Sequence, residues 1–331
     1  MEGFSEGLNL ILTYRCNFRC SHCLANCSPE RTETMTDERA RRYIDAAAQG
    51  HCSRMIGYTG GEPFLYYDRM LLLMKYTYNT YGIAGGAVTN CFWAETPLIA
   101  EKMINELRDS GLRSLVVSLD QFHLQFGQTD RVRNAVIASV LAGVYTTVNS
   151  VVSRDARSMS WQAARKLLSL PEDVEKSELL VGKELHPLLE GRAKGSTLNR
   201  YFLEGDNALY VRPCVCIGVT PAIDPAGNFF GCCCVGDTSE KPEEKIAYVG
   251  NADEVPVPVL YEQMENNLLL MLFRHIGPYA VLQRLLLKDP ALPVSGRYAT
   301  NCDICQELYY NPLVRKALQE MLLELSDQIS A

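Results

Sequence analysis

An alternation of strand-like and helix-like segments runs through the first two thirds of this 331-residue chain and constrains its fold more than any other feature. Short apolar, β-prone runs alternate with longer segments of helical periodicity. We expect strands in GLNLILT (7–13), SRMIGYTGG (53–61), GGAVTNC (85–91), LRSLVVSLD (112–120), VYTTVNSVVS (144–153) and SELLVGK (177–183). Six strands joined through helices predict an α/β fold, in which right-handed crossovers curl a parallel sheet into a partial (β/α)6 barrel.

Capping residues and periodicity define the helices between these strands. Thr36 can cap a helix that Gly50 ends. The expected helices are 36–50, 66–78, 96–110, 129–141 and 160–168. Because the carboxyl ends of parallel strands meet at one edge, we expect the functional loops there.

Three cysteines in the spacing Cys-x3-Cys-x2-Cys follow the first strand directly: Cys16, Cys20 and Cys23. Thiolates bind zinc and iron-sulfur clusters, but structural zinc sites usually have four protein ligands. On a [4Fe-4S] cluster, three cysteines leave the fourth iron free for a substrate or cofactor. A zinc knuckle that borrows His22 or a distant residue is the alternative.

Composition excludes several other classes of protein. The net charge of -7, without a Lys/Arg-rich run, gives little support for a nucleic-acid partner. Apolar stretches such as Leu268–Phe273 are too short to span a bilayer, and the N-terminus lacks the pattern of a signal peptide. We therefore expect a cytoplasmic protein with no membrane partner. Thirteen cysteines in a reducing compartment favour metal binding or catalysis over disulfides.

The barrel half resembles the radical S-adenosylmethionine (SAM) superfamily, through the three cysteines, the Gly60-Gly61-Glu62-Pro63 turn after the second strand and Thr89-Asn90 after the third. The resemblance implies a partial TIM barrel, a [4Fe-4S] cluster on the motif cysteines, SAM chelated by the open iron, and an external one-electron reductant of the flavodoxin or ferredoxin type. It implies that the glycine turn, with Glu62, receives the amino group of SAM. The other side chains expected at this cavity are Asn90, Ser118, Asp120, Asn149 and Arg154. The last four can equally make hydrogen bonds that only stabilise their loops.

A second cysteine pattern lies in the C-terminal third. Asp224 to Gly227 predicts a hairpin turn whose second strand leads to Cys232. Four thiolates can close one site: Cys216, Cys232, Cys302 and Cys305. The pattern resembles the twitch form of the SPASM-like auxiliary-cluster domain and implies one auxiliary [4Fe-4S] cluster, with structural zinc as the alternative. We expect a barrel over 1–205 and a twitch/SPASM-like domain over 206–331, in which Gly277-Pro278 breaks a helix pair.

Within the superfamily, the chain resembles the peptide epimerases of epipeptide biosynthesis, through the Cys232-Cys233 pair, VSLDQFHLQF, NNLLLMLFRHIG and the final Cys-x-x-Cys. The resemblance implies an enzyme that converts an L-residue of a ribosomally synthesised precursor peptide to its D-form. A 5'-deoxyadenosyl radical would remove the Cα hydrogen, and the Cys233 thiol would return one from the opposite face. The adjacent Cys234 leaves this donor open by one residue. Cys214 and Cys234 are otherwise interpreted as spare apolar residues.

Asp120 and His123 would position the substrate backbone or move protons, although His123 can equally make a structural hydrogen bond. Other outcomes of the same chemistry stay open: thioether or carbon-carbon cross-linking of a peptide, or dehydrogenation or epimerisation of a sugar-type molecule. Cys233 would then be another ligand or inert. A different class is an iron-sulfur electron carrier or zinc scaffold, which would not need the Gly60-Gly61-Glu62 turn. We expect a peptide substrate to dock on the barrel or on the C-terminal domain.

Overall fold

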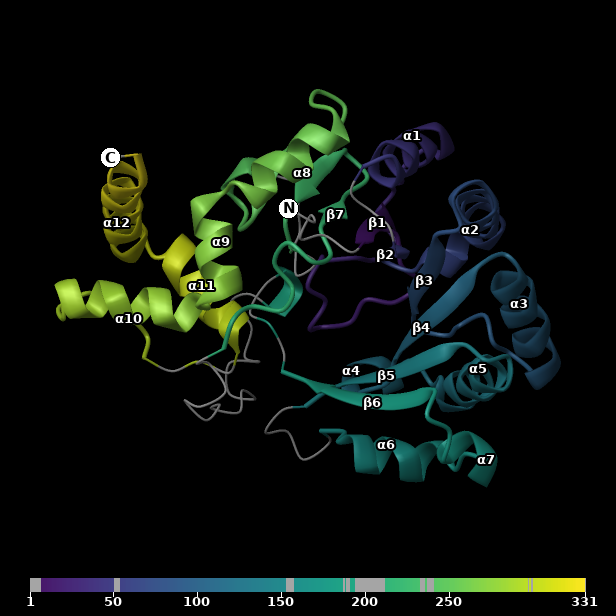
Figure 1. The fold of residues 1–331 in the computed structure, drawn as a ribbon. Helices are drawn as coiled ribbons and strands as arrows, with labels where there is room; N and C mark the ends of the chain where they lie inside the picture. Colours follow the sequence, from purple (N-terminus) through teal and green to yellow (C-terminus); the bar gives the residue numbers. More distant parts are fainter. Residues whose placement is uncertain are drawn as a thin grey trace.

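The computed structural model describes residues 7–50, 54–152, 158–186, 188, 191–193, 212–232, 236, 241–296, 298 and 300–330. Its centre is a nine-stranded sheet of order β6-β5-β4-β3-β2-β1-β7-β8-β9 (Figure 1). The strands are β1 (Gly7–Thr13), β2 (Met55–Gly60), β3 (Ala84–Thr89), β4 (Leu112–Ser118), β5 (Tyr145–Val151), β6 (Leu180–Leu185), β7 (Ala222–Ile223), β8 (Asn228–Phe230) and β9 (Tyr248–Asn251). The helices are α1 (Asp37–Ala48), α2 (Tyr67–Tyr81), α3 (Pro97–Asp109), α4 (Gln121–Leu124), α5 (Thr129–Leu141), α6 (Trp161–Leu168), α7 (Glu172–Glu175), α8 (Val257–Glu265), α9 (Leu268–His275), α10 (Pro278–Lys288), α11 (Asn301–Tyr310) and α12 (Pro312–Ser330).

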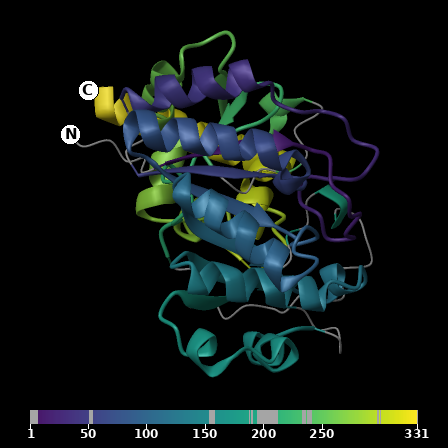
Figure 2. The same ribbon diagram turned by 90° about the vertical axis from the view of Figure 1, so that its right-hand side faces the viewer.

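The six strands β1 to β6 pair in parallel and in chain order, which confirms the expected α/β architecture. Helices α1, α2, α3 and α5 lie along the outer side of this curved sheet (Figures 1 and 2). The sheet does not close on itself, because β6 forms one edge while β1 pairs with β7 instead. The parallel half is therefore a partial barrel.

Side-chain caps start three of the outer helices where the sequence predicts them. Thr36, Thr96 and Ser160 each accept a hydrogen bond from a backbone N–H in the first turn of α1, α3 and α6. Such a cap satisfies one of the N–H groups that a helix start leaves without a partner. The short helix α4 and the long helix α12 had no clear sequence signal and were not expected.

The hairpin of β7 and β8 extends the barrel sheet into the C-terminal part. Oδ1 of Asp224 accepts hydrogen bonds from the N–H groups of Ala226 (2.8 Å) and Asn228 (2.9 Å), and Gly227 has a φ of +89°. This confirms the predicted turn. Because β7 pairs in parallel with β1, the C-terminal part adds to the same sheet. The division at residue 205/206 falls outside the described residues and stays a prediction.

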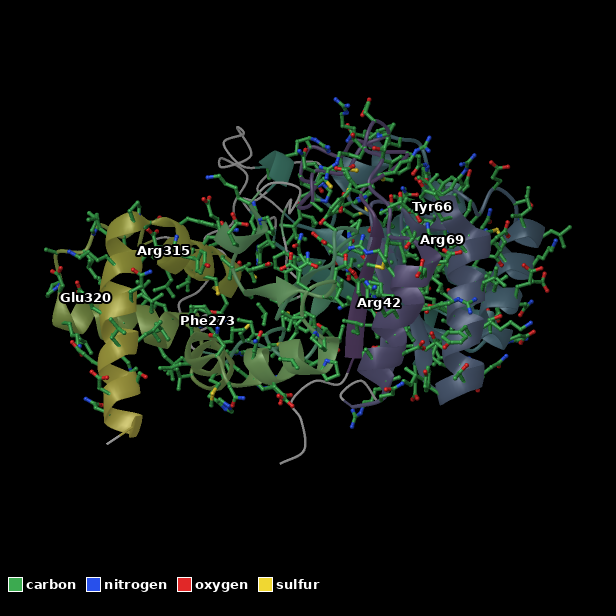
Figure 3. The ribbon with its side chains drawn as sticks, turned by 90° about the horizontal axis from the view of Figure 1, so that it is seen from above. Arg42, Tyr66, Arg69, Phe273, Arg315 and Glu320 are labelled. Carbon is green, nitrogen blue, oxygen red and sulfur yellow. The ribbon has the colours of Figure 1, made fainter. Side chains whose placement is uncertain are left out.

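Helices α9 to α12 form the other end of the molecule. Gly277, with a φ of +86°, separates α9 from α10, which confirms the predicted break. Figure 3 shows Arg315 on α12 at the far end from Arg69 on α2, with the buried Phe273 of α9 between them. Among the helices that the structure describes, none is long and apolar enough to cross a membrane.

Candidate functional site

The loop between β1 and α1, here called the cluster loop (residues 14–28), carries the three motif cysteines: Cys16, Cys20 and Cys23. Two of their sulfurs already accept backbone hydrogen bonds. The N–H of Phe18 donates to Sγ of Cys16 (3.4 Å), and the N–H of Cys27 donates to Sγ of Cys23 (3.3 Å). Donors that point at sulfur favour the thiolate form, which is the metal ligand. The loop therefore fits a cluster held by three cysteines.

The glycine turn after β2 packs directly on the cluster loop. The N–H of Gly61 donates to the carbonyl of Thr13 (2.7 Å). A Cβ atom at Gly60 would lie 2.2 Å from the oxygen of Thr13, and one at Gly61 would lie 2.1 Å from the oxygen of Arg15. Only glycine permits this approach. The turn thus brings the predicted SAM-binding residues next to the motif cysteines.

Glu62 is completely buried, and its carboxylate joins the ends of β2 and β3. Oε1 accepts from the N–H of Phe64 (3.1 Å) and the hydroxyl of Thr89 (3.0 Å), and Oε2 accepts from the N–H of Asn90 (2.7 Å). Burial raises the pKa of Glu62 to about 7, although these donors oppose the shift. Glu62 also precedes the 3₁₀ helix that begins at Pro63. Its predicted role toward the amino group of SAM remains a prediction.

Asn90 extends this contact to the cluster loop itself. Its Nδ2 donates to Oδ1 of Asn17 (2.9 Å) and lies 3.8 Å from Sγ of Cys16, while its Oδ1 accepts from the N–H of Phe92 (3.0 Å). The side chain is buried. The structure therefore brings Asn90 together with the cysteine motif.

Ser118 and Asn149 are cross-strand partners near the carboxyl ends of β4 and β5. Oδ1 of Asn149 is buried and has no hydrogen-bond partner among the described residues. A buried polar atom without a partner costs about 1–3 kcal/mol, so it indicates a ligand that supplies one. This oxygen fits a bound cofactor at the strand ends. Arg154, the remaining predicted SAM contact, lies outside the described residues.

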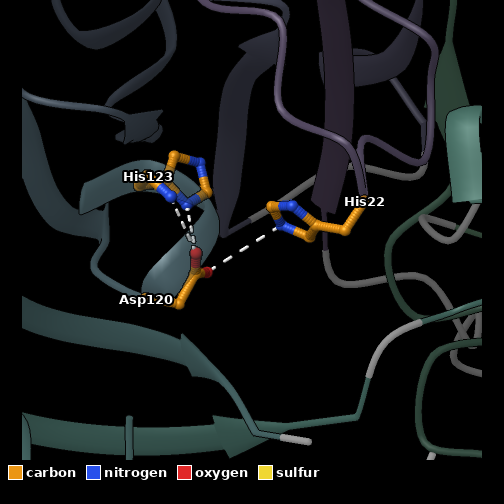
Figure 4. Close-up of side chains that lie close together, drawn as sticks. All are labelled: His22, Asp120 and His123. Carbon is orange, nitrogen blue, oxygen red and sulfur yellow. Dashed lines mark hydrogen bonds and ion pairs between the residues drawn. The ribbon is translucent and has the colours of Figure 1, made fainter. Parts of the chain in front are cut away.

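Asp120 stands at the start of α4 between two histidines, His123 from the same helix and His22 from the cluster loop (Figure 4). Its Oδ1 is 2.8 Å from Nδ1 of His123, and its Oδ2 is 3.8 Å from Nε2 of His22. Burial lowers the pKa of His123, but the carboxylate of Asp120 outweighs burial and raises it to about 10. For His22, burial prevails and lowers the pKa to about 4.

Arg192, which the sequence analysis did not single out, holds the cluster loop from the other edge of the open barrel. The guanidinium of Arg192 donates to the carbonyls of Cys20 (2.5 Å) and Cys27 (2.7 Å). The backbone N–H of Arg192 donates to the carbonyl of Cys23 (3.0 Å). The preceding Gly191 has a φ of +54°, and a Cβ atom there would meet the carbonyl of Leu24 at 2.1 Å. No spacing in the sequence marks this contact.

The C-terminal cysteines line a pocket, here called the cysteine pocket. It contains the four predicted ligands and one further cysteine: Cys216, Cys232, Cys302, Cys305 and Cys214. Cys302 lies in the first turn of α11, where Thr300 and Asp303 form a capping box, and Cys305 begins the second turn. The helix N-terminus favours thiolates there. None of the ten cysteines that the structure describes forms a disulfide. Cys233 and Cys234 lie outside the described residues.

Comparisons with known proteins agree with this geometry. Residues 10–144 match the sequence family described as the Radical SAM superfamily. The chain is 22% identical over 317 residues to the "Putative peptide biosynthesis protein YydG" of Bacillus subtilis (strain 168), which covers 92% of both chains. It is 27% identical over 206 residues to the GTP 3',8-cyclase of Rhizobium meliloti (strain 1021), covering 56% of this chain and 58% of the cyclase.

Among solved structures, the tagged form of anSMEcpe with bound AdoMet aligns with a TM-score of 0.56 and 14% identity, over 95% of this chain and 99% of that one. An identity this low supports the fold alone. The alignment nevertheless extends over both the barrel strands and the C-terminal helices, so the whole architecture has a known counterpart.

Proposed function

This chain is a radical SAM enzyme, and from that premise we propose that it converts an L-residue of a ribosomally synthesised precursor peptide to the D-form. The observation that carries the peptide substrate is the similarity to YydG, a putative peptide biosynthesis protein, over 92% of both chains. The cyclase similarity covers only 56% of this chain. Because YydG aligns along nearly the whole chain, it is the better guide to the substrate.

The cofactors are a [4Fe-4S] cluster and SAM, which when bound supply the 5'-deoxyadenosyl radical that removes hydrogen from the substrate. We assign the cluster to the three cysteines of the cluster loop. We assign SAM binding to Gly60, Gly61, Glu62, Pro63, Asn90, Ser118 and Asn149 and, from the sequence alone, to Arg154. The unpaired buried oxygen of Asn149 supports this assignment, because a ligand would complete its hydrogen bonding.

In the epimerisation, a protein side chain must return hydrogen to the Cα atom on the face opposite the one from which hydrogen was removed. We assign that step to the Cys233 thiol. The S–H bond breaks as the new Cα–H bond forms, which leaves a thiyl radical on Cys233. One electron and one proton restore the thiol. Support comes from the sequence, in which the Cys232-Cys233 pair resembles that of the peptide epimerases.

Electrons for both steps come, in this proposal, from an external one-electron carrier of the flavodoxin or ferredoxin type. We propose that Cys216, Cys232, Cys302 and Cys305 hold one auxiliary [4Fe-4S] cluster next to the donor thiol. The absence of disulfides among the ten described cysteines is consistent with the reducing cytoplasm, where we place the enzyme.

Turnover in heavy water tests the reaction. A thiol hydrogen exchanges with solvent, so an epimerase produces a D-residue that carries one deuterium at Cα. We expect Cys233→Ala to form 5'-deoxyadenosine but to install no solvent deuterium with inverted configuration. The matched variant Cys234→Ala should behave as the unmodified enzyme.

Two results would contradict the proposal. A product that has lost hydrogen overall identifies a cross-linking enzyme or a dehydrogenase. Normal epimerisation by both cysteine variants removes the thiol donor from the mechanism, whereas failure of Cys234→Ala alone moves the donor by one residue.

A further inference from the structure

Thr89, the last residue of β3, places its hydroxyl among three partners. Its Oγ1 accepts from the N–H of Cys91 (3.0 Å) and from Nε1 of Trp93 (3.0 Å), and it lies 3.0 Å from Oε1 of Glu62. A hydroxyl has one hydrogen to donate and two acceptor positions. Because a backbone N–H and an indole N–H can only donate, both acceptor positions are occupied. The single hydrogen of Thr89 is therefore directed at Glu62.

Trp93 is itself held in place beside this hydroxyl. Only 6% of its surface is exposed, and its ring stacks on that of Phe64 at a centroid distance of 4.6 Å with 6° between the planes. The N–H of Phe64 is another donor to Oε1 of Glu62 (3.1 Å). The stacked pair of rings thus connects two of the donors that converge on Oε1, one directly through Phe64 and one through Thr89.

The backbone between Thr89 and Trp93 is bent to make these contacts. Cys91 is completely buried and has a φ of +64°, in the left-handed region that residues other than glycine rarely adopt. In this conformation its N–H points back to the Thr89 oxygen, and the indole of Trp93 reaches the same atom. Strained backbone of this kind persists only where the surrounding contacts hold it. The turn after β3 is therefore organised around the Thr89 hydroxyl.

The carboxylate that receives this hydroxyl can accept one more donor. Oε1 of Glu62 accepts from Phe64 and Thr89, whereas the described contact to Oε2 is the N–H of Asn90 (2.7 Å). A carboxylate offers about four acceptor positions. The count leaves one position on Oε2 among the described contacts. A charged ammonium group fits that position best, since a hydrogen bond between two charged groups is roughly twice as strong as a neutral one.

We propose that Trp93 is a positioning residue for SAM, which acts through the Thr89 hydroxyl to hold the Glu62 carboxylate in place for the ammonium group of the cofactor. Rotation of the hydroxyl away from Glu62 would leave the buried indole N–H without an acceptor, so the indole opposes it. A carboxylate that is already fixed loses little freedom when the ammonium group binds. This inference rests on the proposed assignment of SAM binding to Glu62.

Equilibrium binding to the cluster-loaded enzyme tests the proposal with two ligands that differ in one group. These are S-adenosylhomocysteine, which carries the amino group of SAM, and its analogue without the α-amino group. Trp93→Phe keeps an aromatic ring for the stack but removes the donor. We expect it to bind S-adenosylhomocysteine roughly tenfold more weakly and the deamino analogue within about twofold of the unmodified enzyme. Trp161→Phe on α6, at the other tryptophan of the chain, is the matched control and should bind both ligands normally.

Two changes at Thr89 test the route and serve if Trp93→Phe does not fold. Thr89→Val removes the hydroxyl and should lose the same preference for the amino group, whereas Thr89→Ser keeps the hydroxyl and should retain it. Thr89→Val combined with Trp93→Phe should bind no more weakly than Thr89→Val alone, because the indole then has no hydroxyl to position.

Several results would overturn the proposal. Equal weakening of both ligands by Trp93→Phe, or a further loss in the double variant, would reduce Trp93 to a packing residue. Unchanged affinity in Trp93→Phe would remove its role altogether. Glu62→Gln separates the inference from the assignment on which it rests. If Glu62→Gln keeps the preference for the amino group, both are wrong. If Glu62→Gln loses that preference and Trp93→Phe keeps it, Glu62 still binds SAM and only the inference fails.

Discussion

The cluster loop carries its three motif cysteines in one short stretch of chain, whereas the cysteine pocket takes its cysteines from three separate segments of the sequence. The cluster loop is fixed by many contacts that involve no metal: the glycine turn, Asn90 and Arg192 all hydrogen-bond to it. In the cysteine pocket, Cys232 after β8 and Cys302 and Cys305 of α11 line one cavity together with Cys214 and Cys216. Metal binding should therefore be incidental to folding at the first site and needed for it at the second.

This difference has a physical basis. A loop that neighbouring strands already hold loses little entropy when it binds a cluster. Segments joined by long connections lose much more, and thiolate–metal bonds then contribute directly to folding. Removing cysteines at the two sites should thus separate activity from stability.

The largest effect on activity is expected from the cluster loop. The triple change Cys16→Ala, Cys20→Ala, Cys23→Ala should abolish SAM cleavage and remove one cluster of iron per chain. The unfolding midpoint in urea should change little, because hydrogen bonds such as Gly61 N–H to Thr13 carbonyl remain. Chromatographic detection of 5'-deoxyadenosine checks the first point. Persistent 5'-deoxyadenosine from this variant would contradict the cluster assignment.

The largest effect on stability is expected from the cysteine pocket. Cys302→Ala with Cys305→Ala should remove one further cluster and lower the unfolding free energy by several kcal/mol. The buried Cys91 offers a matched control, since Cys91→Ala changes a core thiol of the barrel and should leave iron content unchanged. Iron content that is unaltered in the double variant would show that this pocket holds no cluster.

The sequence predicts the elements of the barrel half well because local signals dominate there. Thr96 and Ser160 cap helices through side-chain bonds to residues three positions on, and such bonds depend only on neighbouring sequence. The Asp224 to Gly227 turn is equally local. Cysteine spacing likewise carries its own chemistry, so the ligands of the cluster loop could be proposed without a structure.

What the sequence did not predict depends on long-range contacts. Arg192 reaches residues more than 160 positions earlier in the chain, and no spacing or composition marks such a pair. The hydrogen bonds that the Glu62 carboxylate accepts from Phe64, Thr89 and Asn90 were not predicted either, and its role toward the amino group of SAM stays a prediction. Both outcomes follow from how strands neighbour each other in the sheet, which a periodic pattern does not specify.

A glycine substitution sharpens the comparison by disturbing the contacts of the cluster loop while keeping its cysteines. Gly61→Ala would place Cβ 2.1 Å from the carbonyl oxygen of Arg15, so backbone must shift, and we expect a loss of about 3 kcal/mol of unfolding free energy. Gly50→Ala is the matched control, because a Cβ atom there meets nothing within 4 Å and should change stability by less than about 0.5 kcal/mol. Urea unfolding under anaerobic conditions measures both. Equal midpoints for the two variants would show that the loop adapts freely.

The smallest effect is expected from Arg192, which tests whether the cluster loop depends on the far edge of the open barrel. Arg192→Met removes two charge-assisted hydrogen bonds to the carbonyls of Cys20 and Cys27 but leaves the Arg192 backbone bond to Cys23 in place. Each such bond contributes about 1.5–3 kcal/mol when it is shielded from water. Because Arg192 is only partly buried, we expect the cluster loop to lose an amount of stabilising free energy near the lower figure.

That loss should appear as looser retention of the cluster. A difference of about 1.4 kcal/mol is tenfold in an equilibrium, so we expect roughly tenfold faster loss of iron from Arg192→Met to a chelator. Arg19→Met is the matched control on the same loop, because Arg19 forms an exposed ion pair with Glu30, which contributes little to stability. Iron release should be followed by absorbance under anaerobic conditions. If both variants release iron at the rate of the unmodified enzyme, the glycine turn and Asn90 suffice to hold the loop, and the open edge of the barrel contributes nothing to the cluster site.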